Sequence, residues 1–170
     1  MPDRLRQMIF DILGARYGTP GAFPALRVAD VFAGCGCMGL EALSRGAAQC
    51  TFFERDREAL RTLQENIEAL QIERASIVER DAWTASIPGP GDDPHELIFL
   101  DPPYRDSRDS SPDGAVGRYL RRFPAGADRR CLILLHHSAD ADYGKMHTGG
   151  TWRVEDKRRV GSHGLTFFAR

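Results

Sequence analysis

The stretch "RVADVFAGCGCMGLEALSRG", residues 27–46, contains the pattern that decides the fold. Its first six residues, "RVADVF", form a short run that is typical of a buried strand. Gly34, Gly36 and Gly39 follow in G-x-G-x-x-G spacing, and residues 38–47 are typical of a helix. Glycines in front of a helix let the backbone approach a ligand closely, and the helix N-terminus offers unpaired N–H groups. The stretch therefore predicts a strand, a ligand-binding loop and a helix.

The remaining sequence continues this alternation of strands and helices. Apolar stripes with helical spacing and short runs typical of strands follow one another, and two strands joined by a glycine-flanked turn close the chain. The helices are expected at residues 3–17, 56–70 and 115–123, and the strands at 49–54, 75–80, 97–100, 130–137 and within 151–170. The pattern predicts an α/β sandwich with a mostly parallel sheet, helices on both faces and an antiparallel C-terminal strand. At 170 residues, we expect a single domain spanning 1–170.

Composition excludes several classes of protein. Hydrophobic residues make up 42% and charged residues 28%, and no apolar run is long enough to suggest a membrane span. The N-terminus lacks a signal sequence, and the four cysteines show neither a disulfide framework nor a CxxC repeat. We therefore expect a cytoplasmic protein with no metal and no membrane contact. The net charge of -1 gives no overall attraction to nucleic acid, so a polyanion would have to bind local arginine clusters.

The glycine loop predicts a cofactor site together with an acid on the next strand. Glu54 ends that strand, 18 residues after Gly36, and a carboxylate there can accept hydrogen bonds from both hydroxyls of a ribose. With Gly34 and Gly36 this arrangement suits either a dinucleotide or S-adenosylmethionine, and the loop alone does not decide between them. No Lys, Ser or Thr follows in the manner of a Walker motif, which disfavours a nucleotide triphosphatase.

Three further residues favour S-adenosylmethionine. Asp30 lies within the first strand, where its carboxylate could accept hydrogen bonds from the ammonium of a methionine moiety. Asp81 follows the third strand and suits an adenine amine, and the small Ala82 beside it would leave room for the adenine ring. Residues suited to the amino-acid part and to the adenosyl part of the molecule together favour this cofactor.

A second motif, "ELIFLDPPYRD" at residues 96–106, predicts the acceptor site. Asp101 comes directly after a buried strand, and two prolines fix the backbone behind it. If Asp101 and the Pro102 carbonyl each accept one hydrogen from a planar exocyclic amine, the nitrogen lone pair is directed at an electrophilic methyl group. Tyr104 can stack on the ring that bears this amine. The motif predicts methyl transfer by positioning, with Asp101, Pro102 and Tyr104 as the catalytic residues and without a metal.

The same segments resemble a known family. "RLRQMIFDIL", "DVFAGCGCMGLEALSRGA", "FFERD", "FLDPPY" and "VGSHGLTFFAR" are similar, in this order, to the bacterial RsmD-type 16S rRNA guanine-N2 methyltransferases. The resemblance implies a Rossmann-like class I methyltransferase fold, S-adenosylmethionine as the methyl donor and a guanine of 16S rRNA as the acceptor. It also implies that Gly34, Gly36, Glu54 and Asp81 hold the cofactor. Naked 16S rRNA or a 30S assembly particle would be the partner, and we expect a monomer.

The sequence departs from this family at three places. The family usually has a basic hairpin before the first helix, and this hairpin is absent from the sequence, which begins Met1-Pro2-Asp3. Cys35 and Cys37 replace small residues in the glycine loop, and His136 and His137 stand where an acid often follows the fifth strand.

Several alternative functions remain open from the sequence. The same chemistry could act on a DNA adenine or on a protein glutamine amide. A catalytically weakened RNA-binding homologue is a further alternative, and a dehydrogenase is disfavoured because no acid–base pair accompanies the loop.

Overall fold

The computed structural model describes residues 1–85, 94–122, 130–146 and 152–170. It divides into two compact units, Met1–Ala85 (unit 1) and Ser86–Arg170 (unit 2), and each unit is described by itself. The prediction of a single methyltransferase domain over 1–170 stays a prediction. The segment "TASIPGPGDDPHE" at residues 84–96 contains glycines, prolines and acids that predict turns between the third and fourth strands, and its residues 86–93 lie outside the described residues.

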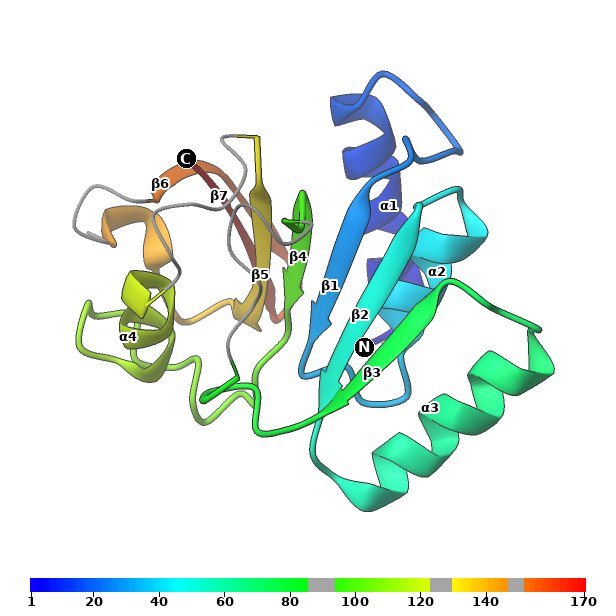
Figure 1. Cartoon of the computed structure of the whole chain (residues 1–170). Helices are drawn as coiled ribbons and strands as arrows, with labels where there is room; N and C mark the ends of the chain where they lie inside the picture. Colours follow the sequence, from blue (N-terminus) through cyan, green and yellow to red (C-terminus); the bar gives the residue numbers. More distant parts are fainter. Residues whose placement is uncertain (86–93, 123–129, 147–151) are drawn as a thin grey trace. The chain divides into compact units, whose positions relative to one another are not determined.

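Unit 1 contains three parallel strands and three helices (Figure 1). The strand order is β3-β2-β1, with Asp30 beside Phe52 and Phe52 beside Ile77. Residues Val28 to Val31 of β1 are all buried, including the acid Asp30, so both faces of this strand lie in the core. The elements are α1 (Asp3–Arg16), β1 (Arg27–Val31), α2 (Cys37–Ser44), β2 (Gln49–Glu54), α3 (Arg57–Ala69) and β3 (Ala75–Glu79).

The helices of unit 1 begin where the sequence provides a suitable residue. Asp56 caps α3, and its side chain accepts hydrogen bonds from the backbone N–H groups of Glu58 and Ala59 at 3.1 and 2.9 Å. Helix α2 begins after Gly36, which has a φ of 82° in the left-handed region. Gly36 lies against the side chains of Leu63 of α3 and Phe52 of β2, and Gly39 of α2 lies against Phe52, so α2 packs closely on the face of β2 that carries this ring.

The described part of unit 2 contains two parallel strands followed by an antiparallel pair, in the order β4-β5-β7-β6 (Figure 1). All four residues of β4 and the first six of β5 are buried, so both faces of these strands lie in the core. The elements are β4 (Leu97–Leu100), α4 (Ala115–Arg122), β5 (Leu132–Ser138), the short 3-10 helix η1 (Tyr143–Lys145), β6 (Arg153–Val160) and β7 (His163–Ala169).

The predicted elements are confirmed with small shifts at their ends. The strands at 49–54 and 97–100 have the same bounds as β2 and β4, and the C-terminal hairpin is antiparallel as expected. The first helix ends at Arg16 rather than at residue 17, and the fifth strand begins at Leu132 rather than at residue 130. The sequence analysis did not predict η1, which is too short to show a helical period.

Candidate functional site

The glycine loop of unit 1 lies at the carboxyl end of β1, where ligands bind in open α/β sheets. A Cβ at Gly36 would lie 2.4 Å from the side chain of Leu63, and one at Gly39 would lie 2.3 Å from the Phe52 ring. Both distances are shorter than any real Cβ contact, so no other residue fits without displacing these neighbours. The two glycines therefore let helix α2 pack directly on β2 and keep the loop close to the strand ends.

Glu54, the predicted ribose ligand, already holds the glycine loop. Its Oε2 accepts a hydrogen bond from the backbone N–H of Gly34 at 2.8 Å, and its Oε1 accepts from Arg55 and Asp56 at 2.7 and 2.9 Å. A carboxylate offers about four lone-pair positions, so three of them are used and one on Oε2 remains. The end of β2 thus fixes the loop, and the Glu54 carboxylate can accept one more hydrogen bond from a hydroxyl while it keeps the three that it already accepts.

Asp30 has a structural partner that the sequence analysis did not foresee. Its side chain is buried, with only 2% of the residue exposed, and its Oδ2 accepts from the backbone N–H of Gly39 at 2.8 Å. Gly39 is the third residue of α2, and the first N–H groups of a helix have no partner within the helix. Asp30 therefore acts as a cap for α2 from the neighbouring strand. Its predicted contact with an ammonium stays a prediction.

Asp81 and Ala82 lie just after β3 and differ in exposure. The Asp81 carboxylate accepts from Arg55 Nη1 at 2.7 Å and from the backbone N–H of Trp83 at 3.0 Å, whereas Ala82 is buried. Because the Arg55 side chain is 62% exposed, its ion pair with Asp81 contributes little stability and an incoming amine could displace it. The predicted adenine contact is compatible with this geometry and stays a prediction.

Two aromatic residues near these acids were missed by the sequence analysis. Phe32 and Trp83 meet edge to face, with their ring centroids 4.7 Å apart. Phe32 has a φ of 64°, which is uncommon for a bulky residue and marks a sharp change of direction where the chain leaves β1. The available signal was the aromatic residue Phe32 at the end of the strand predicted over residues 27–32.

The cysteines of unit 1 differ in their surroundings. Cys35 is exposed, whereas Cys37 is half-buried, and burial together with the nearby charge of Asp30 raises the pKa of the Cys37 thiol to about 11. Cys50 on β2 is buried, and this burial also raises the pKa of its thiol. Only Cys35 therefore presents an accessible thiol in the glycine loop.

In unit 2, Asp101 follows the last residue of β4 and contacts a histidine of the next strand. Its Oδ1 lies 2.7 Å from Nδ1 of His136, whose side chain is only 6% exposed, while 29% of the Asp101 side chain is exposed. Since an ionised carboxylate has no proton, the imidazole is the donor. This contact leaves the other carboxylate oxygen of Asp101 for a further donor.

The two prolines behind Asp101 have different surroundings. Pro102 is buried, and within the described residues no group donates a hydrogen bond to its carbonyl. The Pro103 carbonyl, by contrast, accepts from the backbone N–H of Asp106 at 2.8 Å and closes a turn. The predicted pairing of Asp101 with the Pro102 carbonyl as acceptors of one amine is therefore compatible with the hydrogen bonds of this segment.

Tyr104, the predicted stacking residue, is an aromatic residue on the surface. It is 45% exposed, and its hydroxyl lies 2.9 Å from Nδ1 of His163 and 3.5 Å from Nε2 of His136. Those two ring nitrogens are themselves 3.0 Å apart. Partial burial and the charge of Asp101 raise the pKa of the Tyr104 hydroxyl, which therefore stays protonated at neutral pH. Asp101, Tyr104, His136 and His163 form one connected set, termed here the histidine cluster.

The structure thus groups the predicted site residues into two sets. Unit 1 holds the residues predicted for the cofactor, and unit 2 holds Asp101, Pro102 and Tyr104 together with the unforeseen partner His163. Within the described ranges, no group of three or more His, Cys, Asp or Glu side chains is placed to bind a metal ion. No helix of these ranges is long and apolar enough to cross a membrane.

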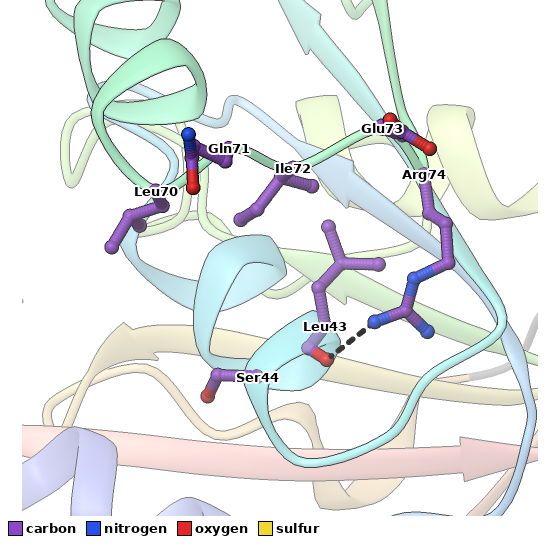
Figure 2. A pocket seen from close by; sticks show the side chains of 7 residues that line it. All are labelled: Leu43, Ser44, Leu70, Gln71, Ile72, Glu73 and Arg74. Carbon is purple, nitrogen blue, oxygen red and sulfur yellow. Dashed lines mark hydrogen bonds between the residues drawn. The ribbon is translucent and has the colours of Figure 1, made fainter.

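A surface pocket of about 420 Å³ in unit 1 is separate from the glycine loop (Figure 2). It lies between the end of α2 and the segment that precedes β3, where Arg74 donates to the Leu43 carbonyl at 3.3 Å. In a parallel sheet this is the amino end of the strands, whereas the glycine loop follows the carboxyl end of β1. The pocket is therefore not the predicted cofactor site.

Comparison with known proteins identifies the family. Residues 1–168 match the family described as Conserved hypothetical protein 95. The chain belongs to this family. The match covers the glycine loop, the Asp101 segment and the C-terminal hairpin, so all the residues of both sets lie within it.

The chain is similar in sequence to proteins that are named as ribosomal RNA methyltransferases. The chain is 38% identical over 103 residues to Ribosomal RNA small subunit methyltransferase D of Escherichia coli, a match that covers 61% of this chain and 48% of that protein. It is 37% identical over 78 residues to the protein of the same name from Haemophilus influenzae, covering 44% of this chain and 40% of that protein. The chain therefore spans about half or less of the length of these curated relatives.

Solved structures share the fold of this chain. A hypothetical protein from Thermus thermophilus is 26% identical with a TM-score of 0.71, over 98% of this chain and 85% of that one. An RNA methyltransferase from Salinibacter ruber, solved in complex with S-adenosyl-L-homocysteine, is 11% identical with a TM-score of 0.67, over 99% of this chain and 92% of that one. The predicted fold class, a Rossmann-like α/β sandwich with an antiparallel C-terminal strand, is confirmed.

Proposed function

We propose that this chain transfers a methyl group from S-adenosylmethionine to the exocyclic amine N2 of a guanine in small-subunit 16S rRNA. The observation that supports it most directly is the placement of Asp101 and Tyr104 after β4. The side chain of each is held by a histidine, Asp101 offers an acceptor oxygen, and the ring of Tyr104 is exposed. Membership of the family and the 38% identity to a ribosomal RNA small subunit methyltransferase support the choice of substrate.

Unit 1 fits the methyl donor by the chemistry of its side chains. Glu54 retains one acceptor position beside the glycine loop, which suits a ribose hydroxyl. Among the described residues, the Asp81 carboxylate accepts from the exposed Arg55 and from one backbone N–H, so an adenine amine could replace the arginine. The complex of the Salinibacter ruber enzyme with S-adenosyl-L-homocysteine supports the same class of donor. When bound, S-adenosylmethionine supplies an electrophilic methyl group on a sulfonium.

Unit 2 would prepare the amine for attack. The free oxygen of Asp101 and the Pro102 carbonyl would each accept one N–H hydrogen, which turns the nitrogen lone pair out of conjugation with the ring. The face of Tyr104 would stack on the guanine, which must therefore be unstacked from its neighbours in the RNA. The lone pair so oriented would accept the methyl group that the sulfonium supplies, the sulfur would keep the electrons of the C–S bond, and one amine proton would pass to water. Positioning of this kind is worth up to roughly 7–11 kcal/mol in well-oriented systems.

The substrate form and the cellular setting belong to the same proposal. The acceptor is naked 16S rRNA or a 30S assembly particle, and the enzyme acts in the cytoplasm as a monomer. The exposed basic residues of β6, which include Arg153, Lys157, Arg158 and Arg159, could meet RNA phosphates. Such contacts predict that RNA affinity falls as salt rises.

The decisive experiment supplies a labelled methyl donor to undermethylated 30S particles and, separately, to naked 16S rRNA, and then maps the modified base. Labelling of N2 in one guanine supports the proposal and identifies the substrate form. Transfer to DNA adenine or to a glutamine amide instead would support those alternatives, which share the same amine chemistry. RNA binding without transfer to any of these acceptors would indicate a catalytically weakened homologue.

A further inference from the structure

The histidine cluster joins side chains that come from three different strands. Asp101 follows β4, His136 lies near the end of β5, and His163 begins β7. Of the four residues of the histidine cluster, the proposed reaction uses Asp101 and Tyr104, so the two imidazoles have no assigned role in it. Yet His136 is a buried titratable group in direct contact with Asp101. A buried polar side chain whose hydrogen bonds are formed makes its surroundings more rigid.

The register of the strands places these groups together. Leu100 pairs with Leu135 in the parallel β4–β5 ladder, so the next residues along the two strands, Asp101 and His136, lie side by side. The contact between them is 2.7 Å, a length typical of a charge-assisted hydrogen bond. Because Asp101 has left the ladder and precedes two prolines, its orientation is set by this side-chain contact as well as by its backbone.

The other half of the cluster fixes the tyrosine. The hydroxyl of Tyr104 is held at 2.9 Å by His163, while 45% of the residue remains exposed. An exposed aromatic side chain normally samples several rotamers, and anchoring its hydroxyl restricts this freedom and leaves the ring face open. The 3.0 Å contact between His136 and His163 links this anchor to the Asp101 contact.

We infer that His136 and His163 are positioning residues for the proposed amine methylation: His136 orients the acid that accepts the amine hydrogen, and His163 orients the tyrosine that stacks on the base. The inference rests on the proposed function and deepens it by adding two residues to the acceptor site. Neither imidazole touches the substrate. His136 acts through Asp101, and His163 acts through Tyr104.

The two imidazoles predict different kinetic defects. His136→Ala releases Asp101, and we expect kcat to fall by about 100-fold with little change in the KM for RNA, the size of effect that follows from a small misplacement of a reacting group. His163→Ala releases Tyr104, and we expect the KM for RNA to rise about tenfold, in line with the loss of base stacking on an aromatic ring.

A conservative variant separates positioning from a structural role. The side-chain amide of Asn can place its N–H near the position of a histidine Nδ1, so His136→Asn should still donate to Asp101 and recover much of the lost kcat. His137→Asn is the matched control, because His137 is the next residue of β5, is equally buried and points to the opposite face, where it contacts Thr166 at 2.9 Å. The control should keep the kinetics of the wild type.

A double-mutant cycle tests the tyrosine anchor without removing a buried ring. Tyr104→Phe deletes only the hydroxyl, so it should raise KM to the same degree as His163→Ala. If both changes act through one contact, the double variant should be no worse than either single variant. Additive losses would overturn the role of His163, and an unchanged kcat in a folded His136→Ala variant would overturn the role of His136.

A measurement that does not depend on activity distinguishes failure of the inference from failure of the proposed function. In imidazole ¹H–¹⁵N spectra of the full chain, Tyr104→Phe should shift the signals of His163 and His136 and leave that of His137 in place. An inactive wild type that shows these shifts contradicts the proposed function and supports the arrangement of the cluster. An active wild type in which none of the variants alters kcat, KM or these signals contradicts the inference alone.

Discussion

The glycine loop of unit 1 and the histidine cluster of unit 2 hold their acidic residues in different ways. In the loop, Glu54 and Asp30 accept hydrogen bonds from backbone N–H groups. In the cluster, Asp101 is held by the side chain of His136, which is linked in turn to His163. Backbone donors are fixed by the fold, whereas side-chain donors can be exchanged by mutation. Changes in the loop should therefore alter stability, and changes in the cluster should alter turnover.

Asp101→Ala is expected to have the largest effect and tests the cluster side of this comparison. Methyl transfer should fall by about 10²–10³-fold, because a preorganised hydrogen-bonding group at the reacting centre is lost. The affinity for S-adenosylmethionine should stay close to that of the wild type, since the predicted cofactor residues belong to unit 1. Single-turnover kinetics and calorimetric titration of the donor measure the two quantities. A parallel loss of both would mean that Asp101 has a structural role and would break the comparison.

Gly39→Ala tests the loop side. The new Cβ would lie 2.3 Å from the ring of Phe52 and 2.5 Å from the Cys50 sulfur, so we expect overpacking to lower the free energy of unfolding by about 1–3 kcal/mol. Denaturant unfolding measures this loss. Phe52→Leu provides room at the same place, and the double variant should recover part of the loss through the coupling of the two sites. Strictly additive losses would mean that the glycine is not required by this contact.

Asp30→Asn tests the cap of α2. The amide keeps the volume of the side chain and its oxygen can still accept from Gly39, but the negative charge that strengthens this hydrogen bond is lost, so we expect a loss of about 1 kcal/mol in the free energy of unfolding. Glu65→Gln is the control, because its exposed pair with Arg61 should contribute only about 0.3–0.5 kcal/mol. Equal effects of the two substitutions on the denaturation midpoint would argue against the cap.

The smallest expected effect is a pH dependence of stability in unit 2. Burial lowers the pKa of His137 in the folded chain from its ordinary value of 6.5, so the unfolded chain binds more protons between the two pKa values. The contribution of His137 to the free energy of unfolding is therefore complete above pH 6.5, and it is lost as the pH falls toward the pKa of the folded state. The slope of the melting temperature against pH in this window should be shallower for His137→Gln than for the wild type. Identical slopes would mean that His137 does not titrate on unfolding.

The loop was predictable from the sequence because its signals are local. The buried run before Gly34, the spacing of the three glycines and the acid at the end of the next strand all depend on neighbouring residues. The bounds of β2 and β4 were predicted correctly from equally local signals. The apolar run of β4 lies between Glu96 and Asp101, and β2 begins and ends at the polar residues Gln49 and Glu54. The capping role of Asp30 was missed, because its buried contact with Gly39 appears only once α2 is packed on the strands.

The histidine cluster was only partly predictable because it depends on the pairing of distant strands. Asp101 and Tyr104 were identified from their motif, but the partner of His136 is set by the β4–β5 register. Aligning the two apolar runs "LIFL" and "LILL" would have placed Asp101 beside His136. No comparable pattern marks His163, which meets Tyr104 only because β7 runs antiparallel to β5.

The contrast between the thiols of the glycine loop has a practical consequence. Alkylating reagents attack the thiolate, so at mildly alkaline pH they should modify the exposed Cys35 well before Cys37, whose pKa is about 11. Cys50 and Cys131 are buried and should react last. The native chain therefore offers a single attachment point for a fluorophore next to Gly34, and the emission of such a label would report occupancy of the loop without any engineered cysteine.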